Sequence, residues 1–112
     1  MFHSMSLNNS AFFGIKSSKQ TIEVRLNDEK RQAIKVGDNI TFSLLPDKKE
    51  EITVKVIQLL TYPTFKELFS NISLEDWNAK DWTIQKCVKL MNDYYSKEEI
   101  QKYGVVGIRI SI

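Results

Sequence analysis

The sequence predicts an α+β fold in which a small mixed β barrel carries helices inserted between its strands. Five segments alternate apolar and polar residues, as half-buried strands do. Segments with helical spacing and N-terminal capping residues separate most of these strands. The strands at 39–45 and 52–60 are joined by a short turn and are therefore antiparallel. One hairpin together with helical crossovers favours a small mixed barrel over a doubly wound sheet.

The composition predicts one domain spanning residues 1–112, because 112 residues leave no room for two ordinary domains. Hydrophobic residues make up 42% of the chain, which is enough for a core. Charged residues of both signs make up 27%, and such a mixture is unlike a disordered chain. The net charge of +2 permits nucleic-acid binding without arguing for it.

No cofactor, metal or membrane partner is expected from the sequence. Cys87 is the single cysteine, so an intrachain disulfide and a multi-cysteine metal site are excluded, and no Rossmann, P-loop or zinc-binding spacing occurs. Residues 1–7 do not resemble a signal peptide, and no apolar stretch is long enough to span a bilayer. We therefore expect a cytoplasmic protein that is a monomer or a weak homodimer.

The first half of the chain predicts two strands that flank a helix. Residues 2–7 form the first strand, and Asn9 or Ser10 caps the helix that follows, because their side chains accept hydrogen bonds from first-turn amides. The second strand covers residues 20–26, and a short helical turn over 29–33 comes after it.

The fourth strand, at 52–60, contains one irregularity. Ile52, Val54 and Val56 alternate with polar residues, but the alternation fails at Ile57. Either a β-bulge shifts the register there, or the strand is buried on both faces.

The second half of the chain predicts capped helices and a final strand. Thr64 with Glu67, and Ser96 with Glu99, have the spacing of a capping box. The segment from 106 to 112 alternates strictly and closes the chain as a strand. Between the two boxes, a predicted helix places these residues on one face: Ile84, Cys87, Val88, Met91, Tyr94 and Tyr95.

The second strand carries the candidate site. Its apolar residues face the core, and Thr21, Glu23 and Arg25 lie on the opposite face. This face is either a solvated surface with a Glu23–Arg25 ion pair or a pocket for a planar polar group. An arginine offers a fork of donors and a carboxylate offers paired acceptors, which suits the edge of a nucleobase.

Several other residues have two interpretations. His3 is either partly buried or at the pocket rim, if the first strand neighbours the second. Trp77 and Trp82 either cap the core from a loop or form a platform on which bases stack. Glu75 and Asp76 have the position of first-turn acids at a helix N-terminus.

The second strand and the residues before it resemble the sequence motif of the ASCH domain, a member of the PUA-like superfamily. That motif has glycine, lysine, glutamate and arginine at the positions of Ser18, Gln20, Glu23 and Arg25. Segments 36–42, 62–65 and 103–108 are similar to that family as well, so the resemblance covers nearly the whole chain. It implies a PUA-like pseudobarrel with a Glu/Arg-lined cleft for RNA or modified nucleosides.

A small bacterial branch of this family removes the acetyl group from N4-acetylcytidine. The resemblance puts Gln20 at its catalytic lysine, Glu23 at its catalytic threonine, and Glu75 or Asp76 near its catalytic glutamate. Gln20 cannot accept a proton, Glu23 has no hydroxyl nucleophile, and Lys19 points to the other face of the strand. That mechanism is therefore not expected, although Glu23 remains a candidate base toward water.

The leading hypothesis is accordingly an RNA- or nucleotide-binding module. Its binding residues are Gln20, Thr21, Glu23 and Arg25, with Lys19 and Lys16 near a phosphate and His3 at the rim. One alternative is an amidohydrolase acting on an acylated nucleoside, with Glu23, Glu75 and Asp76 as catalytic candidates. The other is a protein-interaction module that uses the Trp77–Trp82 surface.

Overall fold

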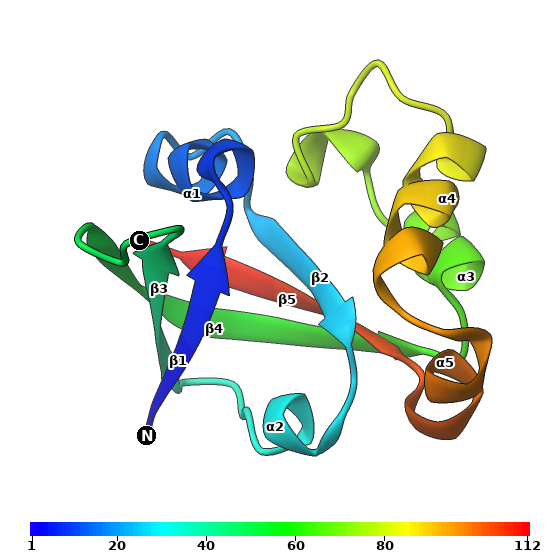
Figure 1. Cartoon of the computed structure of the whole chain (residues 1–112), viewed down its shortest axis with the longest axis horizontal. Helices are drawn as coiled ribbons and strands as arrows, with labels where there is room; N and C mark the ends of the chain where they lie inside the picture. Colours follow the sequence, from blue (N-terminus) through cyan, green and yellow to red (C-terminus); the bar gives the residue numbers. More distant parts are fainter.

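A computed structural model describes residues 1–112, and it contains five strands, five α-helices and one short 3₁₀ helix (Figure 1). In chain order these are β1 (Phe2–Leu7), α1 (Asn9–Lys16), β2 (Ile22–Leu26), α2 (Glu29–Gln32), β3 (Asn39–Leu44), β4 (Glu51–Tyr62), α3 (Phe65–Ser70), η1 (Leu74–Asp76), α4 (Ile84–Tyr94), α5 (Lys97–Tyr103) and β5 (Val105–Ser111).

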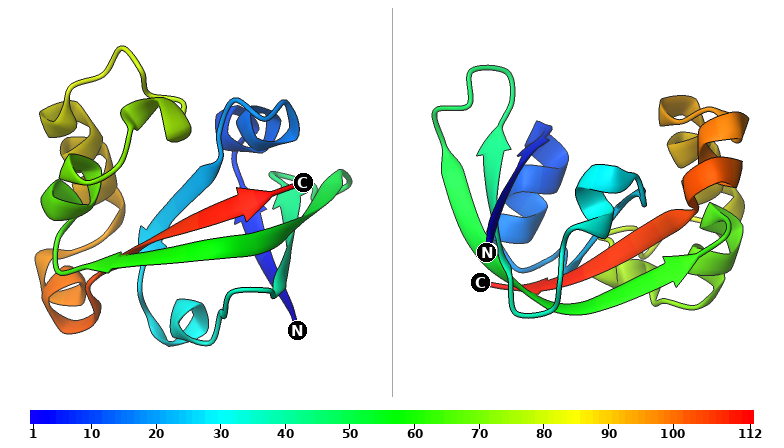
Figure 2. Two further views of the ribbon diagram at one scale, coloured as in Figure 1. Left: turned by 180° about the vertical axis from the view of Figure 1, so that it is seen from behind. Right: turned by 90° about the horizontal axis from the view of Figure 1, so that it is seen from below.

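All five strands form one mixed sheet in the order β1-β3-β4-β5-β2. β1 runs parallel to β3, and the other neighbours are antiparallel. The sheet curls into an open trough with α1 and α2 on its concave side (Figure 2). The two edge strands, β1 and β2, do not pair with each other, so the structure is a half-barrel. The predicted α+β fold with a small mixed barrel and inserted helices is confirmed.

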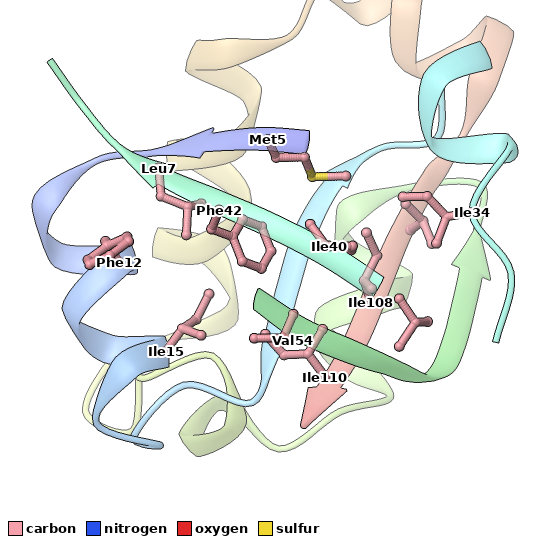
Figure 3. Packing of buried hydrophobic residues seen from close by; sticks show 12 residues of the cluster. Met5, Leu7, Phe12, Ile15, Ile34, Ile40, Phe42, Val54, Ile108 and Ile110 are labelled. Atoms are coloured by element: carbon pink, nitrogen blue, oxygen red, sulfur yellow. The ribbon is translucent and has the colours of Figure 1, made fainter. Parts of the chain in front are cut away.

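Two apolar clusters hold the sheet and helices together. The first lies between the sheet and α1, and Figure 3 shows its side chains, among them Phe12, Phe42 and Ile108. The second lies under α3 and α4 and contains Ile22, Val24, Phe65, Leu68, Phe69, Ala79, Cys87, Met91 and Val105. β5 contributes to both clusters, because Val105 enters the second and Val106 enters the first.

The irregularity in β4 is a bulge. The register with β5 shifts between Val56 and Gln58, and the side chain of Ile57 is 46% exposed. Of the two alternatives, burial on both faces is therefore wrong. The extra residue lets the long β4 bend, so that it pairs with β3 at one end and β5 at the other.

Two details of the predicted helices are wrong. The cap of α1 is Asn8, whose side chain accepts from the Ala11 amide at 3.0 Å, and not Asn9 or Ser10. At α3, the Thr64 hydroxyl accepts from the Glu67 amide, but Glu67 returns no bond, so this cap is half a capping box. The box at α5 is complete, because both the Ser96 and the Glu99 side chains accept backbone bonds.

Candidate functional site

The segment that leads into β2 is tied to η1. Gln20 forms an isolated antiparallel bridge with Trp77, and the Thr21 amide donates to the Asp76 carbonyl at 2.8 Å. Regular strand structure begins only at Ile22. Residues 20–21 and 76–77 therefore form a ridge of two paired backbone segments, with a hollow on either side.

The larger hollow, the main pocket, has a volume of about 520 Å³, within the range of small-molecule sites. It opens between the α1 end of β1 and the face of α4. Gln20, Glu23 and Arg25 supply polar side chains to it. The remaining lining residues are Ser6, Leu7, Asn8, Ser10, Ala11, Val24, Leu45, Trp77, Asn78, Ala79, Trp82, Leu90, Met91, Tyr94 and Tyr95.

Glu23 is the centre of a hydrogen-bonded group in this pocket, although it is only 5% exposed. Its Oε2 accepts from Arg25 Nε at 3.1 Å and from Arg25 Nη2 at 3.0 Å. Its Oε1 accepts from the Val24 amide at 3.1 Å and from Gln20 Nε2 at 3.5 Å. Each of the two predicted alternatives for this face is correct in part. Glu23 and Arg25 form the ion pair of the first alternative, and they line a pocket, as in the second alternative.

Gln20 and Arg25 each have one polar group that makes no hydrogen bond within the protein. Gln20 Nε2 donates to the Ile22 carbonyl at 3.0 Å, while Gln20 Oε1 has no hydrogen-bond partner in the protein. Arg25 Nη2 donates to the Ser6 carbonyl at 2.9 Å, while Arg25 Nη1 has no partner. The two residues therefore offer the pocket one acceptor and one pair of N–H donors.

Trp77 and Trp82 form one wall of the main pocket. Their rings meet edge to face with centroids 6.3 Å apart, and Trp77 packs on Phe69 at 4.8 Å. Both tryptophans also border the second apolar cluster. They cap the core and face the pocket at once, and neither is among the exposed large hydrophobic residues.

The smaller hollow, the second hollow, lies across the ridge and has a volume of about 420 Å³. No apolar side chain lines it. Asp76 forms an ion pair with Arg109 at 3.1 Å at its edge. Its lining residues are Ser18, Lys19, Thr21, Glu75, Asp76, Asn78 and Lys80.

The predicted site residues are thus divided between two hollows. The side chains of Gln20, Glu23 and Arg25 line the main pocket, whereas Lys19 and Thr21 line the second hollow. The catalytic candidates Glu75 and Asp76 do not share a pocket with Glu23, so the structure does not bring this set together. Ser18 adopts a φ of 62°, so it takes the left-handed conformation that the family glycine would adopt freely.

His3 lies away from both hollows. β1 pairs with β3 and not with β2, so the condition for placing His3 at the pocket rim is not met. Its Nε2 lies 2.8 Å from Asp38 Oδ2. This bond, with a second from the Lys35 amide, lowers the pKa of Asp38 from 3.8 to about 2. Lys16 is also engaged elsewhere, in an exposed pair with Glu50 at 3.3 Å.

Three further observations bear on the chemistry. The structure contains no cluster of His, Cys, Asp and Glu side chains arranged as metal ligands. None of its helices has the length and apolar character needed to cross a bilayer. Burial raises the pKa of the Cys87 thiol, which packs in the second cluster outside both hollows.

A family model for the ASCH domain matches residues 5–112. The chain belongs to the ASCH domain family. This family is PUA-like and often RNA-binding. Among curated proteins, none matches the chain.

Several solved structures are similar to this chain in fold. The chain is 37% identical to hypothetical protein PH0355, with a TM-score of 0.87 and coverage of 99% of this chain and 98% of that one. It is 33% identical to protein PF0455 from Pyrococcus furiosus, with a TM-score of 0.76 and coverage of 99% and 96%. The ASCH protein from Zymomonas mobilis shares the fold at 15% identity, with a TM-score of 0.67 and coverage of 97% and 66%.

Sequence reasoning missed much of the ASCH pocket wall. Ser6, Asn8 and Ser10 come from the β1–α1 connection, and Leu90 and Tyr95 come from or follow α4. The alternation and spacing rules assign these residues to their own elements, but they do not say which elements face each other. Only Asn78 could have been noticed in the sequence, because asparagine tolerates a positive φ and often occupies turns. Here Asn78 has a φ of 56° and lines both hollows.

Proposed function

We propose that this ASCH protein binds RNA or a nucleotide-like ligand by holding a nucleobase in the main pocket. The observation that carries the proposal is the buried Gln20–Glu23–Arg25 group at the polar side of an aromatic-walled pocket of about 520 Å³. Trp82 and Tyr95 line this pocket and are the proposed stacking partners of the base, and base–aromatic stacking contributes about 1–3 kcal/mol per base.

The charge balance of the main pocket favours a base over a bare phosphate. Glu23 neutralises Arg25 at 3.0 Å, so the pocket offers directed hydrogen bonds without a net positive charge. The unpartnered donors on Arg25 Nη1 and the unpartnered acceptor on Gln20 Oε1 would suit a planar group that carries both acceptors and donors. The edge of a nucleobase has this chemistry.

Glu23 has a positioning role in this proposal. Its two oxygens accept four hydrogen bonds from Arg25, Val24 and Gln20, so it has little capacity left to act as a base toward water. Instead it orients the guanidinium so that Nη1 remains available to the ligand. The division between Glu23 and the pair Glu75 and Asp76 gives no support to the amidohydrolase alternative.

The test is calorimetric titration with nucleosides, nucleotides and short RNAs. Arg25→Lys keeps the charge but loses the planar fork, so ligand affinity should fall by about tenfold or more. Arg31→Lys is the matched control, because Arg31 is similarly buried in an ion pair with Asp28 but lines neither hollow. Arg25→Ala is a poorer variant, since it would leave the buried Glu23 carboxylate without its main partner.

The proposal is wrong if no member of the panel binds to the wild-type protein. It is also wrong if Arg25→Lys and Arg31→Lys have the same affinity as the wild type. Release of cytidine from N4-acetylcytidine above a no-protein control would instead favour the hydrolytic alternative.

A further inference from the structure

We infer that the second hollow binds the phosphate of the same ligand, so that the protein recognises a phosphorylated nucleoside in preference to the free nucleoside. This inference rests on the proposed function, because the main pocket is taken to hold the base. The hollow would then supply the positive charge that the main pocket lacks.

The two hollows are adjacent. The ridge of paired segments at residues 20–21 and 76–77 separates them, and Asn78 lines both. Gln20 lines the main pocket, while its chain neighbours Lys19 and Thr21 line the second hollow. A ribose separates base and phosphate in a nucleotide, and here the paired backbone segments at residues 20–21 and 76–77 separate the two binding regions.

The charges around the second hollow favour an anion. Lys19 and Lys80 are exposed and take part in no ion pair of the structure. The Asp76 carboxylate is already paired with Arg109 at 3.1 Å, which leaves Glu75 as the one carboxylate of the hollow without a cationic partner. Two unpaired ammonium groups therefore face one unpaired carboxylate, in contrast to the neutral Glu23–Arg25 pair of the main pocket.

Uncharged donors complete the hollow. The hydroxyls of Ser18 and Thr21 and the side-chain amide of Asn78 line it, and none of them makes a hydrogen bond within the protein. Hydroxyl, amide and ammonium donors together suit phosphate oxygens.

The experiment compares nucleosides with their 5′- and 3′-monophosphates by calorimetric titration at low ionic strength. The double variant Lys19→Gln/Lys80→Gln removes both ammonium groups. The matched control, Lys66→Gln/Lys97→Gln, removes two charges from exposed positions on α3 and α5 that line neither hollow. Inorganic phosphate alone serves as the base-free probe.

We expect a monophosphate to bind the wild type about tenfold more tightly than its nucleoside, a gain that weakens with added salt. Lys19→Gln/Lys80→Gln should reduce the gain to about twofold or less, because each exposed charge contact contributes only a few-fold. The control variant should keep the gain, and all three proteins should bind the nucleoside equally. A trinucleotide that binds as tightly as the monophosphate would identify the phosphate as part of an RNA chain; a weaker one would identify it as a terminal phosphate.

Two outcomes overturn the inference and leave the proposed function intact. One is a nucleoside that binds as tightly as its monophosphate, and the other is a phosphate-dependent gain that survives in Lys19→Gln/Lys80→Gln. If nucleosides do not bind but inorganic phosphate does, and only through Lys19 and Lys80, the phosphate site stands and the base pocket is wrong. If neither probe binds, both proposals are wrong.

Discussion

Glu23 shows how one buried carboxylate can fix the position of a neighbouring arginine. Two of its four hydrogen bonds come from the same guanidinium, and a third comes from the next backbone amide. These contacts compensate the cost of burying its charge at 5% exposure. The result is an Arg25 side chain held in one orientation, which reduces the conformational entropy that a ligand must remove on binding.

Asp38 is the residue for which the structure makes a pH prediction. Its hydrogen bonds from His3 and the Lys35 amide lower its pKa from 3.8 to about 2. Because the folded-state pKa lies below the ordinary one, these bonds stabilise the fold fully above about pH 4, and the contribution is lost as the pH falls toward 2. Asp38→Asn should therefore lower the free energy of unfolding at pH 7, and the two proteins should converge between pH 4 and 2.

Urea unfolding at pH 7, 5, 3 and 2 checks this expectation. Asp93→Asn is the matched control, because Asp93 is exposed and makes no hydrogen bond or ion pair through its side chain. A difference between wild type and Asp38→Asn that stays constant down to pH 2 would contradict the assigned role of the carboxylate.

At the scale of elements, the local sequence patterns predicted individual strands and helices well, but they did not predict which segments contact each other. Ile22, Val24 and Leu26 alternate and are all buried, as the strand pattern predicted. Thr21 was expected on the same face as Glu23, but its amide bonds to the Asp76 carbonyl, and the regular strand begins after it. That bond joins segments far apart in the chain, and periodicity cannot reveal it. The same limit applies to the order of strands, since β1 lies beside β3 and not beside β2.

The two predicted capping boxes offer a prediction at this scale. Glu99 occupies the N3 position of α5 and accepts a bond from the Ser96 amide at 3.0 Å, whereas Glu67 at N3 of α3 makes no such bond. Glu99→Ala should cost about 0.5–1 kcal/mol, as expected for one hydrogen bond. Glu67→Ala should change the free energy of unfolding by less than about 0.5 kcal/mol.

Urea unfolding of both variants at pH 7 separates the two caps. Each glutamate is exposed and lies in the first turn of its helix, so the interaction with the helix dipole is similar for both. Equal losses would mean that the reciprocal bond at Ser96 contributes nothing measurable.

At the scale of the whole molecule, Arg25 connects the two open edges of the half-barrel. It belongs to β2 at one edge of the sheet, and its Nη2 donates to the carbonyl of Ser6 in β1 at the other edge. β1 pairs only with β3, so this carbonyl contact is a restraint on its free side. The residue proposed to contact the base therefore also closes the trough beside the pocket.

The last prediction follows from this double role. The variant Glu23→Gln/Arg25→Met removes the ion pair as a unit, so no buried charge is left without a partner, and it also removes the contact to Ser6. Amide hydrogen exchange should become about tenfold faster in β1, since a bond from a charged donor contributes about 1.5–3 kcal/mol. The single variant Glu23→Gln keeps the Arg25–Ser6 contact and is the control. If exchange rises equally in β1, β4 and β5, or rises no more than in Glu23→Gln, then Arg25 does not hold the two edges together.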